Sequence, residues 1–109
     1  MVHRRHPAHP ALLPPDRLAA AWGTSPEVLP PVECAYDPEL HTGPRDVIES
    51  VEQRAAREDV AREVCAACPA RAWCGQYAAT MRPTFGVWAG RTAREIALDT
   101  RTHAVTIAS

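Results

Sequence analysis

The pattern of apolar and polar positions is helical over most of the chain beyond residue 43. From Pro44 to Cys68 there is no further Gly or Pro, and Ala, Glu and Arg, which favour helices, dominate. Apolar residues three and four positions apart form one helix face, at Val47, Ile48, Val51 and Ala55. The later valines leave this face, so we expect a break near residues 56–59 and two helices rather than one. The charged residues between them are expected to form a solvated helix surface, at Arg54, Glu58 and Arg62.

Turn signals set the predicted start of this helical region. Residues 34–43 are expected to form a loop, because Asp37-Pro38 begins a turn and Gly43-Pro44 marks its end. Pro44 lacks a backbone donor and suits the first turn of a helix, with Thr42 or Gly43 as the cap.

Two further helices and a tight turn are expected after Pro69, which cannot continue a helix. Residues 70–81 restart a helix. The apolar segment Phe85–Gly90 contains glycines near both ends, which predicts a tight hairpin. Residues 92–95 read Thr-Ala-Arg-Glu, a capping box that opens a last helix ending near Arg101.

The first part of the chain is rich in proline. Seven of the eleven prolines lie at or before Pro31, and repeated proline removes the backbone donors that helices and sheets need. Residues 1–31 are therefore predicted to be a disordered, flexible arm. Within it, Asp16 to Trp22 could form a short helix, with Asp16 as its N-cap and Gly23 at its end.

Length and composition then limit the fold to one small domain. Of 109 residues, roughly 75 remain outside the arm, and a core of that size is marginal without a disulfide or metal staple. The sequence predicts a small all-α domain of four-helix type over residues 32–103, with a frayed tail at residues 104–109.

The ends and the charge of the chain narrow the classes of protein. The positively charged start is followed by no apolar segment of a signal peptide, and no stretch is long and apolar enough for a membrane span. We therefore expect a cytoplasmic protein with reduced cysteines. The formal net charge of −1 offers no general attraction for nucleic acid.

Four cysteines carry the strongest chemical signal. Cys65, Cys68 and Cys74 lie within ten residues, and Cys34 precedes them by thirty intervening positions. The C-x2-C pair projects from one side of a helix end, Cys74 can fold back after Pro69, and the loop can bring Cys34 close. Spacing alone leaves three outcomes open, namely an iron–sulfur cluster, a structural zinc ion, or disulfides. Four of the five histidines lie in the arm or tail, and His41 is expected to be solvated rather than a ligand.

Taken together, these residues resemble the WhiB-like family of actinobacteria and their phages. The matching features are Cys34 followed by Asp37-Pro38-Glu39-Leu40, the cysteine triplet with Pro69, and the turn Gly86-Val87-Trp88-Ala89-Gly90 before a capped helix. They span about residues 32–100.

The resemblance implies a [4Fe–4S] cluster held by Cys34, Cys65, Cys68 and Cys74 and sensitive to oxygen and nitric oxide. It also implies a transcriptional regulator rather than an enzyme, with no small-molecule substrate and no membrane partner. Its partners would be region 4 of the primary sigma factor, bound through the cluster face and Gly86, Val87, Trp88, Ala89 and Gly90, and in some members promoter DNA. The resemblance further implies that apo forms can form intramolecular disulfides and bind DNA.

Three positions depart from the family pattern. His41-Thr42 replace paired aromatics, and Ala89 stands where glycine is commoner, which a tight loop tolerates if its φ is negative. The tail lacks a basic run, so few phosphate contacts are expected, with candidates at Arg91, Arg94 and Arg101. Trp88 fits two interpretations, an exposed anchor for a partner or a core residue covering the cluster.

Two other functions follow from the same cysteines. Cys65 and Cys68 could act as a thiol–disulfide oxidoreductase, although no thioredoxin-like βαβ pattern surrounds them. A zinc-stapled interaction module without a redox role is the other alternative.

Overall fold

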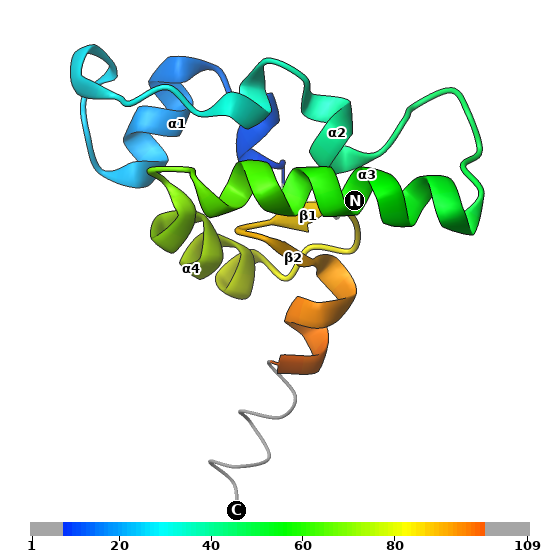
Figure 1. Ribbon diagram of the computed structural model, residues 1–109. Coiled ribbons are helices and arrows are strands. Elements are labelled where there is room, and N and C mark those ends of the chain that lie inside the picture. The colour runs from blue at the N-terminus through cyan, green and yellow to red at the C-terminus, as the bar shows by residue number, and fades with distance from the viewer. Residues whose placement is uncertain (1–7, 100–109) are drawn as a thin grey trace, which may run out of the picture.

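The computed structural model describes residues 8–99, which are mostly helical with one small β-hairpin (Figure 1). The elements are α1 (Pro15–Trp22), α2 (Pro38–Thr42), α3 (Val51–Ala66), α4 (Arg71–Met81), β1 (Val87–Trp88) and β2 (Arg91–Thr92). Residues 93–99 form a further helix, and three short 3-10 helices occur at Pro10–Leu12, Pro26–Val28 and Glu33–Ala35. In Figure 1, α3 lies between α1 and α2 on one side and α4 with the hairpin on the other. The expectation of a small, mostly helical fold is confirmed, but its four-helix arrangement is not. Within residues 8–99, every helix is too short or too polar to cross a membrane.

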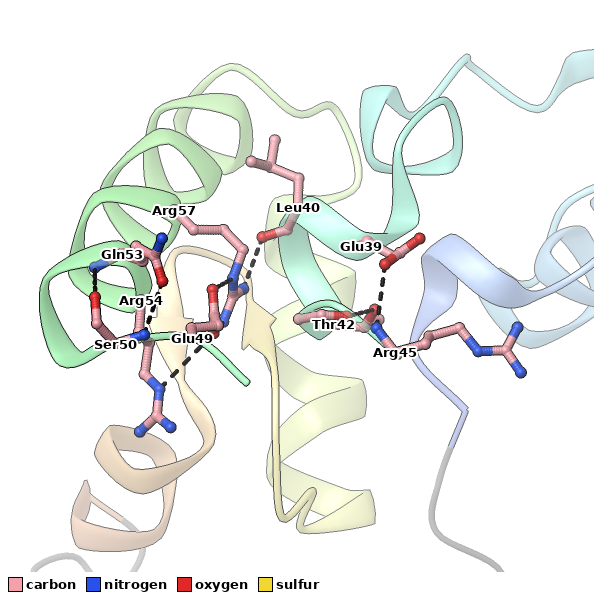
Figure 2. Close-up of polar contacts among 10 residues, drawn as sticks. Glu39, Leu40, Thr42, Arg45, Glu49, Ser50, Gln53, Arg54 and Arg57 are labelled. Carbon is pink, nitrogen blue, oxygen red and sulfur yellow. Dashed lines mark hydrogen bonds and ion pairs between the residues drawn. The ribbon is translucent and has the colours of Figure 1, made fainter. Parts of the chain in front are cut away.

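The central helix α3 begins later than predicted and is not broken. Ser50 caps it: its hydroxyl accepts from the Gln53 amide at 3.1 Å, and the Gln53 side chain accepts from the Ser50 amide at 2.8 Å (Figure 2). This reciprocal capping box fixes the start at Val51, so the predicted start at Pro44 is wrong. The expected break at residues 56–59 is also wrong. Most of α3 is solvent-exposed and only Ala61 and Cys65 are buried, so the drifting valines did not mark a change of helix.

The apolar side chains that opened the predicted helix do not face the core. Val47, Ile48 and Val51 are 71%, 97% and 79% exposed. Residues 43–50 instead form an irregular segment that leads into α3. The helical spacing of these apolar residues therefore did not indicate a helix face buried in the core.

Part of the predicted loop after Cys34 is helical. Pro38 stands in the first turn of α2, where its missing donor costs nothing, and Gly43 with a φ of 92° ends the helix. Arg57 joins α3 to the end of α2 and to the segment that follows it. Its guanidinium donates to the carbonyl of Leu40 at 2.9 Å and makes a two-pronged contact with Glu49 at 2.8 and 2.9 Å (Figure 2).

The proline-rich segment packs on the domain. Leu18 and Ala19 of α1 are buried, and the ring of Trp22 stacks on Trp73 of α4 with centroids 5.9 Å apart. Three prolines stand in the first turns of α1 and two of the 3-10 helices, so they begin short helices instead of preventing them. The prediction of a disordered arm is therefore wrong for residues 8–31. Gly23 ends α1 as expected, but Pro14 rather than Asp16 is the N-cap.

An aromatic core joins α4 to the hairpin. Trp73, Tyr77 and Trp88 form a continuous series of rings, with centroids 5.0 Å apart for the first pair and 6.1 Å for the second. Trp88 is 1% exposed, and its indole N–H donates to the Phe85 carbonyl at 2.7 Å. Ala78 and Ile96 pack against the same core.

The predicted hairpin is present, with Val87 opposite Thr92 and Trp88 opposite Arg91. Its two turn residues, Ala89 and Gly90, have φ values of 55° and 86°, as in the type I′ turns favoured by hairpins. Ala89 thus has a positive φ, whereas a tight loop was expected to tolerate alanine here with a negative φ. In the second strand, Thr92 begins the capping box with Glu95, which confirms that prediction.

The helix of residues 93–99 is fastened to α3. Arg62 contacts the Glu95 carboxylate at 2.8 Å and the Gly90 carbonyl at 3.1 Å, so it is not simply part of a solvated helix surface. The predicted helix end near Arg101 lies outside the described residues.

Candidate metal centre

All four cysteines line one buried cavity. Cys34 comes from the 3-10 helix Glu33–Ala35, Cys65 from the last turn of α3, Cys68 from the turn that follows, and Cys74 from α4. None of them is in a disulfide. The structure therefore brings together every cysteine that the sequence pattern singled out.

The turn between α3 and α4 orients the C-x2-C pair. The Cys68 amide donates to the Cys65 carbonyl at 3.1 Å, which tightens the end of α3. The Ala70 amide points back to the Cys68 sulfur at 3.4 Å. Because Pro69 prevents the helix from continuing, the chain turns here and α4 restarts at Arg71.

Burial raises the pKa of two of the thiols, those of Cys34 and Cys74. Burial, with the neighbouring sulfurs of Cys68 and Cys65, raises the pKa of Cys34 to about 12. Burial, with the nearby Cys65, likewise raises the pKa of Cys74 to about 12. A metal group binding here must displace these protons, since thiolates rather than thiols are the ligands.

At Cys65, the backbone of the hairpin tip opposes the rise in pKa that burial causes. Burial raises the pKa of Cys65, whereas hydrogen bonds from the backbone of Gly90 and Ala89 and the charge of Arg71 oppose the rise. The hairpin backbone approaches closely, because a Cβ added at Gly90 would lie 3.8 Å from the Cys65 Cβ. The turn therefore supplies donors that favour a thiolate.

The described cysteines line the cavity without forming a ready site for a single metal ion. A tetrahedral zinc ion with Zn–S bonds of about 2.3 Å needs its sulfurs about 3.8 Å apart. Among residues 8–99, no group of three or more ligating side chains is placed to hold a single metal ion. A cluster distributes its thiolates over several irons and so suits a wider ring of ligands.

The predicted partner-binding turn is largely buried. Val87 and Trp88 are 0% and 1% exposed, while Gly86, Ala89 and Gly90 are half-buried. The interpretation of Trp88 as an exposed anchor is therefore wrong, and its place in the core is confirmed. That Trp88 covers a cluster stays a prediction.

Two histidines also line the cavity, and neither was predicted from the sequence to have a role there. His9 belongs to the predicted arm, yet it is 2% exposed: its Nδ1 accepts from the Ala11 amide at 2.9 Å and its Nε2 lies 2.6 Å from the Val87 carbonyl oxygen. His41 is 1% exposed, so the expectation that it is solvated is wrong. A signal was available for His41, because the resembling family has an aromatic ring at that position.

The surroundings of the two rings differ. Burial lowers the pKa of His9 to about 4, so the ring is neutral at pH 7. Burial also lowers the pKa of His41, although the nearby Ala61 carbonyl opposes the fall. Neither ring nitrogen of His41 reaches hydrogen-bonding geometry with any partner in the described part of the chain.

Comparisons with known proteins agree with the cysteine pattern. A stretch of 42 residues is 50% identical to the transcriptional regulator WhiD of Streptomyces coelicolor, and it covers only 38% of either chain. No solved structure matches the chain. Residues 34–98, which include all four cysteines and the hairpin, match the family described as Transcription factor WhiB. Since this match covers more than half of the chain, the protein belongs to the WhiB family.

Proposed function

We propose that the protein is a cytoplasmic transcriptional regulator that holds a [4Fe–4S] cluster and responds to oxidants or nitric oxide. The observation that carries this proposal is the convergence of four unbridged cysteines, Cys34, Cys65, Cys68 and Cys74, on one buried cavity. Membership of a transcription factor family supplies the regulatory role.

The residues around the cavity suit an anionic cluster. Four thiolates bring more negative charge than the irons and sulfides neutralise, so such a site needs donors and cations nearby. The backbone of Ala89 and Gly90 and the Arg71 side chain supply them at Cys65. The remaining lining includes apolar side chains, such as Leu18 and Val32, that keep water away. When bound, the cluster supplies a centre that small oxidants and nitric oxide can attack.

Loss of the cluster would change the fold. The four ligands connect the segment around Cys34, the end of α3 and the start of α4, which are otherwise joined by a small core. Once released, the thiols could pair as disulfides. The signal would thus act as a local folding switch that alters a partner surface.

The proposed partner is region 4 of the primary sigma factor, bound beside the hairpin. Since Trp88 is buried, exposed side chains near the turn must make the contact. Phe85, immediately before Gly86, is 42% exposed and lines a groove together with Val47 and Ile48. Clustered exposed apolar residues of this kind mark protein-binding surfaces.

A co-purification experiment tests this partner. The cluster-bound protein, purified without oxygen, should retain the sigma factor, and Phe85→Ser should reduce this retention at least about tenfold. Val60→Ser is the matched control, because Val60 is 48% exposed but lies on α3 outside the groove. Equal loss in both variants, or loss in neither, would place the sigma factor elsewhere.

Direct contact with promoter DNA is a secondary part of the proposal. Arg91 forms an ion pair with Asp99, which reduces its availability for phosphate, while Arg94 is exposed. Arg101 lies outside the described residues. With a net charge of −1, we expect DNA binding to be weak on its own and to depend on the sigma factor.

The thiol–disulfide oxidoreductase is less well supported. A reactive cysteine in such enzymes has a lowered pKa, whereas burial raises the pKa of Cys65 here. An insulin-reduction assay decides the matter, and activity that disappears in Cys65→Ser would favour the enzyme. A zinc-bound interaction module is the other alternative, and metal analysis separates it from the cluster.

A further inference from the structure

His41 is a buried polar side chain without a hydrogen-bonding partner. It lines the cavity with the four cysteines and is 1% exposed, yet neither Nδ1 nor Nε2 has a partner among the described residues. Such a group loses its hydration on folding and gains nothing in return, so an unpaired buried donor calls for an explanation.

His9 provides the contrast within the same cavity wall. Its ring lies 5.6 Å from that of His41, but both of its nitrogens are engaged, by the Ala11 amide and the Val87 carbonyl. Burial alone therefore does not leave a histidine unpaired here.

The other side chains of the cavity leave one kind of acceptor for His41. Among the described lining residues there is no carboxylate, hydroxyl or amide side chain. The Trp73 indole N–H already donates to the Ala21 carbonyl at 3.1 Å, and Arg71 can only donate. The Ala61 carbonyl lies near the ring but outside hydrogen-bonding geometry with either nitrogen. The sulfurs of the cysteines, and of any group they bind, are therefore the remaining acceptors.

The backbone around His41 is held in place by two contacts. The carbonyl of His41 packs against Gly86, where an added Cβ would lie 3.1 Å from it, and the neighbouring Leu40 carbonyl accepts from Arg57. Short helix α2 is thus fixed against both the hairpin and α3, which places the His41 backbone beside the cavity.

We propose that His41 donates a ring N–H hydrogen bond to a sulfur of the iron–sulfur group held by the four cysteines. This inference rests on the proposed cluster and assigns to His41 a role in setting the cluster's reduction potential. Hydrogen bonds to the sulfurs stabilise the added negative charge of the reduced state and so raise the potential.

The test measures the midpoint potential of the cluster in the full-length protein. His41→Phe keeps a ring of similar size and removes the donor, so its potential should be lower than that of the wild type. His41→Gln retains an N–H donor and should give an intermediate value. Thr80→Val is the control, since it loses an exposed hydrogen bond to the Gln76 carbonyl outside the cavity lining and should not shift the potential.

The outcomes are distinct. An unchanged potential in His41→Phe, or equal shifts in His41→Phe and His41→Gln, would overturn the role of His41. A wild-type protein that contains no iron and sulfide would instead end the proposed function itself.

A second measurement needs no variant and covers the case in which His41→Phe does not fold. In wild-type protein with 15N-labelled histidine, pulsed EPR of the reduced cluster should show a weak nitrogen coupling transmitted through a hydrogen bond. The absence of any coupling, or the strong coupling of a nitrogen bound directly to iron, would contradict the inference.

Discussion

At the scale of single residues, Gly86 occupies a position that no larger residue can share without strain. Its φ is 95°, and an added Cβ would lie 3.0 Å from the Trp88 Nε1 and 3.1 Å from the His41 carbonyl oxygen. Gly75 on α4 differs, because a Cβ there would meet only the Ala89 Cβ at 3.6 Å, an ordinary contact distance.

These two glycines should respond in opposite ways to alanine. Gly86→Ala should lower the free energy of unfolding by about 2 kcal/mol or more, through left-handed strain and displacement of the Trp88 ring. Gly75→Ala should leave it unchanged or raise it by up to about 1 kcal/mol, since alanine favours a helix. Anaerobic urea unfolding followed by circular dichroism measures both, and equal effects would contradict the described turn.

Trp88 should behave as a core residue. Trp88→Ala removes a side chain that is 1% exposed and should lower the free energy of unfolding by about 3–5 kcal/mol. Loss of sigma-factor binding in this variant would then follow from loss of the fold. If Trp88→Ala left stability unchanged in thermal unfolding while abolishing binding, the buried placement would be contradicted.

Residue identity and spacing predicted which cysteines come together, but not the other residues around the cavity. The four cysteines were found because thiols at this spacing have few other uses in a reducing compartment. His9 and Trp88 could not be placed, because their burial depends on contacts between distant parts of the chain: His9 reaches the Val87 carbonyl, and its ring packs on that of Trp88. His41 could have been placed from its aromatic counterpart in the family, but its missing partner is visible only in the folded chain.

At the scale of elements, the capping box of α3 decides where the central helix begins. Ser50→Ala removes the acceptor for the Gln53 amide and should lower the free energy of unfolding by about 1 kcal/mol. Ser25→Ala is the control, because Ser25 also precedes a short helix but makes no side-chain cap bond, and its effect should stay within about 0.5 kcal/mol. Denaturant titration compares the two, and an equal loss would mean that the cap contributes nothing specific.

The helix of residues 93–99 should respond to acid through Glu95. The Thr92 backbone amide, followed by Arg62, lowers the pKa of this carboxyl. A carboxyl with a lowered pKa in the folded state stabilises the fold above its unfolded value of about 4.3, and this contribution is lost as the pH falls through the folded value.

Glu95→Gln should therefore differ most from the wild type at neutral pH. The difference in melting temperature should shrink as the pH falls below about 4, where the wild-type carboxyl is itself protonated. A difference in melting temperature that stayed constant with pH would show that the charge of Glu95 does not stabilise the fold.

Local sequence signals predicted the boundaries of elements well where few residues could mark the same boundary. Pro69, Gly23 and the Thr92–Glu95 capping box each marked a real boundary. The segment before α3 was misjudged because Pro44 and Ser50 both fit a helix start, and only the reciprocal bonds of Ser50 and Gln53 distinguish them. Residues 8–31 were misjudged because proline begins short helices as readily as it prevents long ones.

At the scale of the whole molecule, the cavity lies between parts of the chain that are otherwise joined by a small core. Cys34, Cys65, Cys68 and Cys74 belong to three helical segments and one turn, and the packed aromatic core lies mainly on the α4 and hairpin side. A group bound by all four would hold the two sides together, so its removal should loosen the fold and the groove beside Phe85. Sensing and partner binding would then be two results of one structural change.

The most direct test of this account is analysis of iron, acid-labile sulfide and zinc in protein purified without oxygen, combined with Mössbauer spectroscopy. We expect one [4Fe–4S] cluster per chain, and loss of that cluster in each of Cys34→Ser, Cys65→Ser, Cys68→Ser and Cys74→Ser. A colourless protein that contains one zinc ion and no sulfide would contradict it.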